Sequence, residues 1–451
     1  MAAVNREFWA PRAWVGGRWR EQVRLAAGAD GCWAAIDCGV APPPGAERLA
    51  GDVLPALVDA HSHAFQRAFV GLSERRDDAH DDFWSWRDRM YGVAAKLRPE
   101  QLRAVAAHLY TELLAGGYSQ VCEFHYLHHD LDGSAYADPA AMSLALADAA
   151  QDAGIGLTLL PVLYERAGFQ ADALRPDQCR FATTPRQVRE IADALRGRPG
   201  VTVGAAVHSL RAARPASIAE LAAACDGPLH VHVAEQTAEV DDCLAATGCR
   251  PIEWLARHAG LDVRWQLVHA THATPDEIAA VAASGAGVVI CPATEADLGD
   301  GFCDLPRWLD AGVPLAVGSD SQVVRAWPEE LRWLEWGQRL LHRRRNVSAA
   351  PGVEPSSAAR LFERLRAGGG TAAGFARWGL EVGARADLVE LDPVEPALAG
   401  LPPGHRLDGL VFGAPAAPFK RTLVGGRWVA PDREGIRARF EAVMAEIWTE
   451  S

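Results

Sequence analysis

Short apolar runs alternate with longer helical stretches through the middle of the chain, from about residue 56 to residue 377. The apolar runs are short and nearly continuous, as is usual for strands that are buried on both faces. Eight such runs occur, at residues 53–58, 120–124, 156–163, 201–207, 229–233, 266–268, 287–290 and 315–317. The stretches between them are rich in Ala, Leu, Arg and Glu, for example residues 99–115, 217–224 and 274–283. This alternation predicts parallel strands that are joined by helical crossovers.

Eight strand–helix units favour a closed (β/α)8 barrel of the TIM type over an open sheet. An open doubly wound sheet is the alternative. It fits less well, because no Gly-x-Gly-x-x-Gly turn follows the first predicted strand. We therefore predict a barrel over residues 56–377.

The two ends of the chain resemble each other. Val-Gly-Gly-Arg-Trp occurs at residues 15–19 and again at residues 424–428, each time beside alternating apolar residues. A Gly-Gly pair between such runs predicts a hairpin turn, and residues 386–392 form a further short apolar strand. Chance repetition in a Gly-rich and Trp-rich chain is the alternative to our prediction that both ends build one β-domain. That domain would comprise residues 1–55 and 378–430, followed by a C-terminal helix over residues 431–451 with Asp432 as its cap.

The composition is that of a globular protein and argues against several classes of partner. The 451 residues are 49% hydrophobic and 23% charged, and 45 Lys and Arg against 58 Asp and Glu give a net charge of −13. An acidic chain without blocks of Lys or Arg favours neither nucleic acid nor an anionic membrane as partner. No apolar run reaches the ~18 residues that cross a bilayer. Because the nine cysteines form no Cys-x-x-Cys pair and the first residues lack the order of a signal peptide, we expect a cytoplasmic protein.

Polar clusters follow several of the predicted strands, at the end of a barrel where active sites are built. The first cluster holds His61 and His63, and residues two apart on a strand point the same way, so both project into the barrel mouth. The second holds His230, His232 and Glu235. We interpret His232 as a metal ligand and His230 as a packing residue. Glu235 can transfer protons beside a metal or cap the following helix.

Two further clusters complete the pattern. His269 follows the sixth apolar run, and Asp320 follows the eighth through Gly-Ser. A buried carboxylate is costly unless it is paired or binds a metal. Each cluster alone is more often structural, but four of them at strand ends are difficult to explain by chance. Three histidines and one carboxylate around an open position are typical of hydrolytic zinc sites, and Fe2+ or Mn2+ can occupy the same ligands.

This arrangement resembles the amidohydrolase superfamily. The pair His232-x-x-Glu235 is similar to its mononuclear deaminase branch, and no lysine is present on the fourth predicted strand to bridge a second metal. The segment 383–389 and the two Gly-Gly hairpins resemble the composite β-sandwich of that superfamily. The resemblance implies that Glu235 and His269 lie beside the reacting centre. It also implies one Zn2+ per subunit with four ligands, His61, His63, His232 and Asp320.

Longer strings make the resemblance more specific. Within the superfamily they are similar to the N-formimino-L-glutamate deiminases of histidine degradation, which implies hydrolysis of that compound to N-formyl-L-glutamate and ammonia. The strings are residues 61–68, 83–87, 123–130, 208–211 and 330–335. The resemblance also implies five substrate-binding residues, Gln66, Arg87, Tyr126, His208 and Arg211.

A substrate with two carboxylates agrees with two arginines, because a planar guanidinium donates paired hydrogen bonds to a carboxylate and lysine replaces it poorly. Stacking on Trp84 or Trp86 explains Arg87 equally well, and local pairing explains Arg211. Tyr126 and His208 can donate hydrogen bonds to a carboxylate or simply pack.

The residues also suggest a mechanism. We predict that Asp320 accepts a proton from water, Glu235 protonates the departing nitrogen, and His269 orients the attacking oxygen. Formiminoaspartate, one methylene shorter, and a guanine-like ring are alternative substrates. A metal-binding homologue without activity is the alternative outside the enzymes.

Two residues depart from the deiminase pattern. Gln322 stands where a histidine is expected and Asp297 where an asparagine is usual. We expect both to alter the shape of the pocket, and an added acid to weaken binding of an anionic substrate. The Trp-rich segment 333–336 suggests a homodimer contact, and a buried helix face explains it equally well. The expected partners are therefore a small dicarboxylate and a second copy of the chain.

Overall fold

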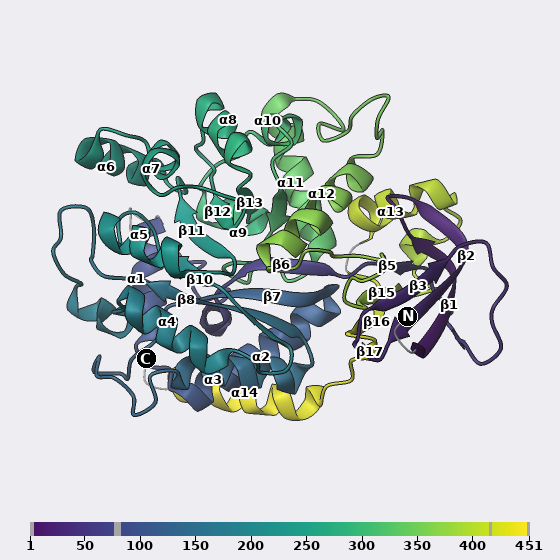
Figure 1. Cartoon of the computed structure of the whole chain (residues 1–451), viewed down its shortest axis with the longest axis horizontal. Coiled ribbons are helices and arrows are strands. Elements are labelled where there is room, and N and C mark those ends of the chain that lie inside the picture. Colours follow the sequence, from purple (N-terminus) through teal and green to yellow (C-terminus); the bar gives the residue numbers. More distant parts are fainter. Residues whose placement is uncertain (1–3, 76–82, 415–416, 449–451) are drawn as a thin grey trace.

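The computed structural model describes residues 4–75, 83–414 and 417–448, and the described strands form two sheets (Figure 1). The larger sheet runs in the order β14-β13-β12-β11-β10-β8-β7-β6, with β9 paired to β8, and its ladders are all parallel. Its strands are β6 (Leu57–Ser62), β7 (Tyr118–His125), β8 (Gly156–Leu163), β9 (Val201–Val203), β10 (Ala205–Val207), β11 (Leu229–Val233), β12 (Trp265–His269), β13 (Gly287–Ile290) and β14 (Leu315–Val317). A bridge between Ser62 and Asp320 joins the first strand to the last, which closes the predicted (β/α)8 barrel.

Helices occupy the crossovers between these strands and surround the barrel (Figure 1). They are η1 (Ala64–Ala68), α1 (Phe83–Ala94), α2 (Pro99–Ala115), α3 (Ala141–Ala153), η2 (Pro176–Phe181), α4 (Pro185–Leu195), α5 (Pro215–Ala224), α6 (Thr237–Thr247), α7 (Pro251–His258), α8 (Pro275–Ser284), α9 (Pro292–Leu298), α10 (Leu305–Asp310), α11 (Trp327–His342) and α12 (Ser357–Ala372). Several begin with proline, whose fixed φ suits the first helical position. Thr184 and Thr274 precede two of these prolines and accept hydrogen bonds from backbone N–H groups of the first turn, which defines where α4 and α8 begin.

Two of the predicted strands are divided in the structure. The run 53–58 supplies β5 (Val53–Leu54) to the smaller sheet and β6 to the barrel. Pro55 lies between them, and proline cannot donate a hydrogen bond to a ladder. The run 201–207 is likewise interrupted at Gly204, between β9 and β10.

Both ends of the chain contribute to the smaller sheet, on the right in Figure 1. Its order is β17-β16-β15-β5-β1-β2-β3, with β4 paired to β1. Besides β5, its strands are β1 (Val4–Trp14), β2 (Trp19–Gly28), β3 (Trp33–Asp37), β4 (Glu47–Arg48), β15 (Leu388–Leu391), β16 (Phe419–Val424) and β17 (Arg427–Trp428). Leu25, Trp33, Leu388 and Leu423 belong to a small apolar core of its own.

The two Gly-Gly pairs form hairpin turns, as predicted. Gly16 and Gly17 connect β1 to β2, and Gly425 and Gly426 connect β16 to β17. All four glycines have positive φ, between 55° and 76°. A two-residue turn of this type needs positive φ at both positions, which glycine adopts without a steric penalty.

The chain ends in a helix that packs on the barrel. Between β15 and β16 lie η3 (Pro396–Leu398), η4 (Pro403–His405) and α13 (Arg406–Gly413). The predicted C-terminal helix is α14 (Arg433–Trp448), which lies along α2, and residues 449–451 fall outside the described part. Its Trp448 donates from Nε1 to the carbonyl of Ala68, the last residue of η1. None of the described helices is long and apolar enough to cross a membrane.

Candidate metal centre and active site

The predicted site residues meet at the carboxyl ends of the barrel strands. His61 lies on β6, His232 on β11 and His269 on β12, and Asp320 follows β14. Apart from His61, which is fully buried, all the predicted residues line one cavity. They are His63, Gln66, Arg87, Tyr126, His208, Arg211, His232, Glu235, His269 and Asp320. Segments that are as much as 259 residues apart in the sequence, at His61 and Asp320, therefore supply one site, as in other barrels of this class.

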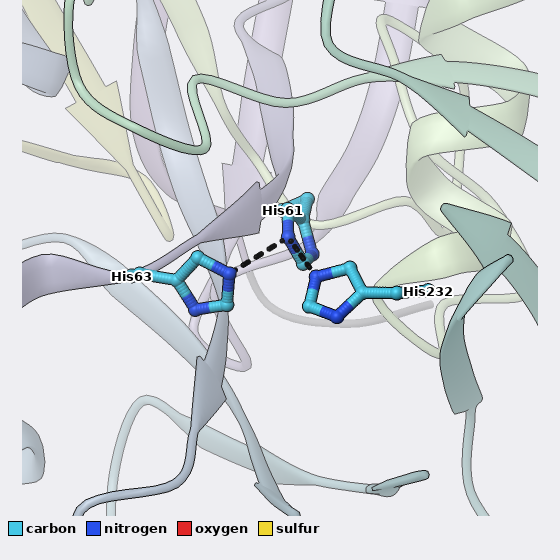
Figure 2. A group of neighbouring side chains, drawn as sticks. All are labelled: His61, His63 and His232. Atoms are coloured by element: carbon cyan, nitrogen blue, oxygen red, sulfur yellow. Dashed lines mark hydrogen bonds between the residues drawn. The ribbon is translucent and has the colours of Figure 1, made fainter. Parts of the chain in front are cut away.

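Three histidine rings converge on one point (Figure 2). Nε2 of His61 lies 3.1 Å from Nε2 of His63 and 3.0 Å from Nε2 of His232. The opposite nitrogens, Nδ1 of His63 and Nδ1 of His232, contact the carbonyls of Phe124 and His208 at 2.9 and 3.0 Å. A carbonyl accepts hydrogen bonds only, so each Nδ1 carries a proton, and each Nε2 of these two neutral rings bears a lone pair.

This arrangement fits a cation. The His61 Nε2 can donate a proton to one of its two neighbours at most, so at least one contact between nitrogens has no proton. Burial lowers the pKa of all three histidines, that of His61 to about 3, which keeps them in the neutral form that binds metals. A divalent ion shared by His61, His63 and His232 would satisfy all three lone pairs.

Asp320 supplies a carboxylate to the same point. Its Oδ1 lies 3.4 Å from Nε2 of His61 and 3.5 Å from Nε2 of His63. Burial by itself would raise the pKa of Asp320, but the hydrogen bond with His61 and the positive charge of His269 hold that pKa below its usual value. Asp320 has a φ of +49°, an uncommon conformation for a residue with a side chain. The backbone therefore turns sharply at Asp320. The lowered pKa means that its carboxylate is ionised.

Glu235 and His269 lie on the other side of Asp320. Nε2 of His269 is 3.6 Å from Oε1 of Glu235 and 3.8 Å from Oδ2 of Asp320. Burial raises the pKa of Glu235 to about 7, and the charge of Asp320 adds to this while that of His269 opposes it. Burial opposes protonation of His269, but the charge of Glu235 and the hydrogen bond to Glu295 outweigh it and raise its pKa to about 10.

Glu295 and Asp300 are site residues that the sequence reading missed. Glu295 lies on α9, just after β13, and its Oε1 is 3.4 Å from Nδ1 of His269 and accepts from the backbone N–H of Cys291 at 3.0 Å. A carboxyl oxygen of Asp300 lies within 4.8 Å of a carboxyl oxygen of Glu235 and of a ring nitrogen of His269. The rule that polar residues after barrel strands face the site could have identified Glu295, since it follows the seventh predicted strand.

The two predicted arginines share an aromatic neighbour. The guanidinium carbon of Arg87, on α1, lies 4.6 Å from the ring centre of Trp84, and that of Arg211 lies 5.6 Å from the same ring. Arg87 therefore stacks on Trp84 and also lines the cavity, so the two alternatives that the sequence left open do not exclude each other. Among the described residues, neither buried Nε has a hydrogen-bond partner. Two guanidinium groups in one cavity wall are suited to anionic ligands, and a terminal nitrogen of Arg87 also lies 3.6 Å from Oδ1 of Asp88.

Neutral polar groups line the same cavity as the arginines and the histidines. Gln66 Nε2 donates to the hydroxyl of Tyr126 at 3.5 Å, and Tyr126 OH lies 3.8 Å from Sδ of Met90. Burial, with the nearby charge of Arg211, holds the pKa of His208 well below its usual value, so this ring is neutral. These groups can offer hydrogen bonds without adding charge to the cavity.

The residues that depart from the deiminase pattern do not line the cavity. Gln322 is fully buried behind the site, and Asp297 is exposed on α9, whereas its neighbour Leu298 reaches the cavity wall. Neither side chain therefore lines the cavity, but Gln322 contacts the backbone of Asp320, which does. His230 is a packing residue, as predicted, and its Nε2 donates to the carbonyl of Ala372 at 2.9 Å.

The sequence pattern of the Amidohydrolase family matches residues 53–429. The chain belongs to the amidohydrolase family. Formimidoylglutamate deiminase of Pseudomonas aeruginosa is 46% identical over 430 residues, which cover 94% of each chain. A 5-methylthioadenosine/S-adenosylhomocysteine deaminase of Natronomonas pharaonis is 30% identical over 85% of this chain and 82% of its own.

Two solved structures share this fold. A crystal structure of an amidohydrolase from Brucella melitensis superposes with a TM-score of 0.93 at 40% identity, covering 98% of this amidohydrolase and all of that chain. An adenosine deaminase from Xanthomonas campestris, whose structure contains zinc, has a TM-score of 0.82 at 23% identity and shows the fold alone.

Proposed function

We propose that this amidohydrolase is a metal-dependent deiminase that hydrolyses N-formimino-L-glutamate to N-formyl-L-glutamate and ammonia in histidine degradation. The relative from Pseudomonas aeruginosa, with its name and 46% identity over 94% of the chain, supports this substrate. The observation that carries the proposal is the cavity itself, which is lined by residues of the histidine cluster and by two arginines. One end suits hydrolysis and the other suits a dicarboxylate.

His61, His63, His232 and Asp320 would hold the metal, one ion per subunit. A bound divalent ion would act as a Lewis acid and lower the pKa of water toward about 7. Zn2+ is our choice because imidazole and carboxylate donors suit it, and Fe2+ or Mn2+ are accepted by the same set. Neither β9 nor β10 contains the lysine that a bridged pair of metals would require.

Arg87 and Arg211 would bind the two carboxylates of the substrate. Each guanidinium can donate two parallel hydrogen bonds to a carboxylate, and burial strengthens such bonds. Gln66, Tyr126 and His208 would add neutral hydrogen bonds. Held in this way at its carboxylates, the substrate would direct its formimino carbon toward the histidine cluster.

The chain's own acids and bases would then move the protons. The ionised Asp320 would accept a proton from water while the oxygen of that water attacks the formimino carbon. His269, charged and fixed by Glu295, would donate a hydrogen bond to that oxygen. Glu235 would protonate the imine nitrogen, and Asp320 would pass the proton it took from water to the same nitrogen as the carbon–nitrogen bond breaks. Ammonia would then leave, and the new hydroxyl group would return its proton to Glu235 as the formyl carbonyl forms.

Ammonia release by the zinc-loaded protein tests the proposal directly. We expect rapid release from N-formimino-L-glutamate and slower release from formiminoaspartate and guanine. The two formimino compounds differ by one methylene group, which changes the activation free energy by only about 1–3 kcal/mol. Release from guanine alone would contradict the arginine assignment. Zinc binding without ammonia release from any of the three would favour a metal-binding protein without this activity.

The remaining expectations stay proposals. All nine cysteines are free, which supports a reducing compartment such as the cytoplasm. Trp333 and Trp336 are exposed on α11, so the alternative of a buried face is wrong for these two rings, and they support a homodimer contact. We also retain the division into a β-domain of residues 1–55 and 378–430, a barrel of residues 56–377 and a C-terminal helix.

A further inference from the structure

The barrel closes at a seam with little backbone pairing. The first and last strands, β6 and β14, are joined by one bridge, between Ser62 and Asp320, whereas every other pair of neighbouring barrel strands shares two or more residue pairs. The Asp320 N–H donates to the carbonyl of His61 at 3.0 Å, and the His63 N–H donates to that of Asp320 at 3.4 Å. The proposed metal ligands therefore lie on both sides of the weakest junction in the sheet.

The two sides of this seam approach each other closely. A Cβ atom on Gly318 would lie 2.6 Å from Cβ of His61 and 2.8 Å from its backbone N and O. Contacts of that length do not occur between real side chains, so only glycine fits at this position. The strands meet too tightly for side chains between them, and the contacts that fix their relative position must come from the adjoining turn.

Gln322 makes those contacts across the seam. Its Nε2 donates to Oγ of Ser62 at 3.1 Å and to the carbonyl of Asp320 at 2.7 Å. Its Oε1 lies 2.8 Å from Oγ of Ser319. The side chain is fully buried, and the residue has a φ of +70°. The Gln322 amide thus connects Ser62, which lies between two metal-site histidines, with Ser319 and with the metal-site Asp320.

Two buried carboxyl groups extend this connection into the barrel wall. Glu123, on β7, accepts from Oγ of Ser62 at 2.9 Å and from the N–H of Ala64 at 2.6 Å. Asp59, on β6, accepts from the N–H of Ser319 at 2.9 Å, and its other oxygen lies 2.5 Å from Oγ of Ser319. Each contact restrains the position of a residue next to a proposed ligand.

We propose that Gln322 is a positioning residue of the metal centre, which holds the His61–His63 side of the seam against the Asp320 side and so slows loss of the metal. An ion leaves fastest when one ligand can move away from the others, and partners behind the ligands typically change metal affinity by about 10- to 100-fold. The amide is required because it donates to Ser62 while it accepts from Ser319. The inference rests on the proposed metal site and is independent of the proposed substrate.

Zinc release to a coloured chelator tests this role without any measurement of activity. The full-length zinc-loaded protein would be compared with Gln322→Ala and with Gln322→Glu, which keeps the shape but places an oxygen against the carbonyl of Asp320. The matched control is Gln338→Ala. Gln338 is an equally buried glutamine on α11 whose Nε2 donates to the carbonyl of Cys303 at 3.0 Å, far from the seam in sequence.

We expect zinc release to become at least about 10-fold faster in both Gln322 variants and to stay within about twofold of wild type in the Gln338 variant. Thermal unfolding of the metal-free proteins would measure any general loss of stability in each alanine variant. Release at the wild-type rate from the Gln322 variants, or equal acceleration in the Gln338 variant, would overturn the proposal.

Milder variants cover a failure of Gln322→Ala to fold. Ser62→Ala and Ser319→Ala each remove one hydroxyl that contacts the amide, and both should release zinc several-fold faster than wild type. Wild-type rates in both would refute the role of Gln322. Wild-type protein that takes up no zinc would instead contradict the metal site itself, which separates the two failures.

Discussion

Oε1 of Glu235 lies 3.6 Å from Nε2 of His269, and both groups face the cavity beside Asp320. A carboxyl group with a pKa near 7 next to a charged imidazole is suited to deliver a proton to a departing nitrogen. The charge of His269 favours ionisation of Glu235, but burial opposes ionisation more strongly and keeps the pKa of Glu235 raised. This balance makes Glu235 the most informative residue for a first test.

Glu235→Gln should lower kcat by about 10²- to 10⁴-fold, the range in which a positioned proton donor contributes to catalysis. The amide keeps the shape and the hydrogen-bonding reach of the side chain but cannot supply the proton. Steady-state ammonia release measures the loss, and zinc content checks that the metal site is intact. Turnover near the wild-type rate would remove Glu235 from the mechanism.

The pH profile should show the same group. The folded-state pKa of Glu235 is raised to about 7, chiefly by burial, so the protonated donor predominates below that pH and is lost above it. We expect kcat/KM to decline above about pH 7, approaching a tenfold loss for each pH unit. Rates from pH 6 to pH 10 with constant zinc occupancy provide the measurement, and a flat profile across that range would contradict the assignment.

Arg211→Met should raise KM by about 10- to 100-fold, because a buried charge-assisted hydrogen bond contributes roughly 1.5–3 kcal/mol. Arg211→Lys should restore little of this, since an ammonium group cannot form the paired bonds of a guanidinium. Arg214→Met is the matched control, since Arg214 lies on the same loop but is exposed. Equal KM values in wild type and Arg211→Met would show that this arginine does not bind a carboxylate.

Glu295→Gln should lower kcat by about tenfold or more with little change in KM. The carboxylate of Glu295 contacts Nδ1 of His269 and supports its charge, so its loss would affect the hydrogen bond that His269 offers during attack. Asp297→Asn on the same helix is the control, because that side chain is exposed, and its kinetics should stay within about twofold of wild type. Unchanged kcat in the Glu295 variant would count against this role.

Removal of the metal should abolish activity, and added zinc should restore it. Because Nε2 of His63 belongs to the histidine cluster, His63→Ala should reduce the zinc content well below one ion per chain in elemental analysis. Full activity after exhaustive chelation would contradict a metal-dependent reaction. A wild-type content near two ions per chain would contradict the single site.

The sequence by itself determined the barrel and most of the site. Alternation of apolar strands with helices fixes the architecture, because parallel strands need helical crossovers to return the chain to the same edge. The two-residue period of a strand places His61 and His63 on one face, and the position of polar residues after strands predicts which of them meet. These features depend on local geometry, so neighbouring residues are sufficient to reveal them.

Only the tertiary structure decided how distant segments contact one another. It divides the run 53–58 between two sheets, brings Glu295 behind His269, and turns Gln322 under the seam to reach Ser62. Each of these depends on the distance between atoms from segments that no local pattern relates. Sequence periodicity specifies which face a side chain occupies, but its partners, its pKa and its solvent exposure depend on what packs against that face.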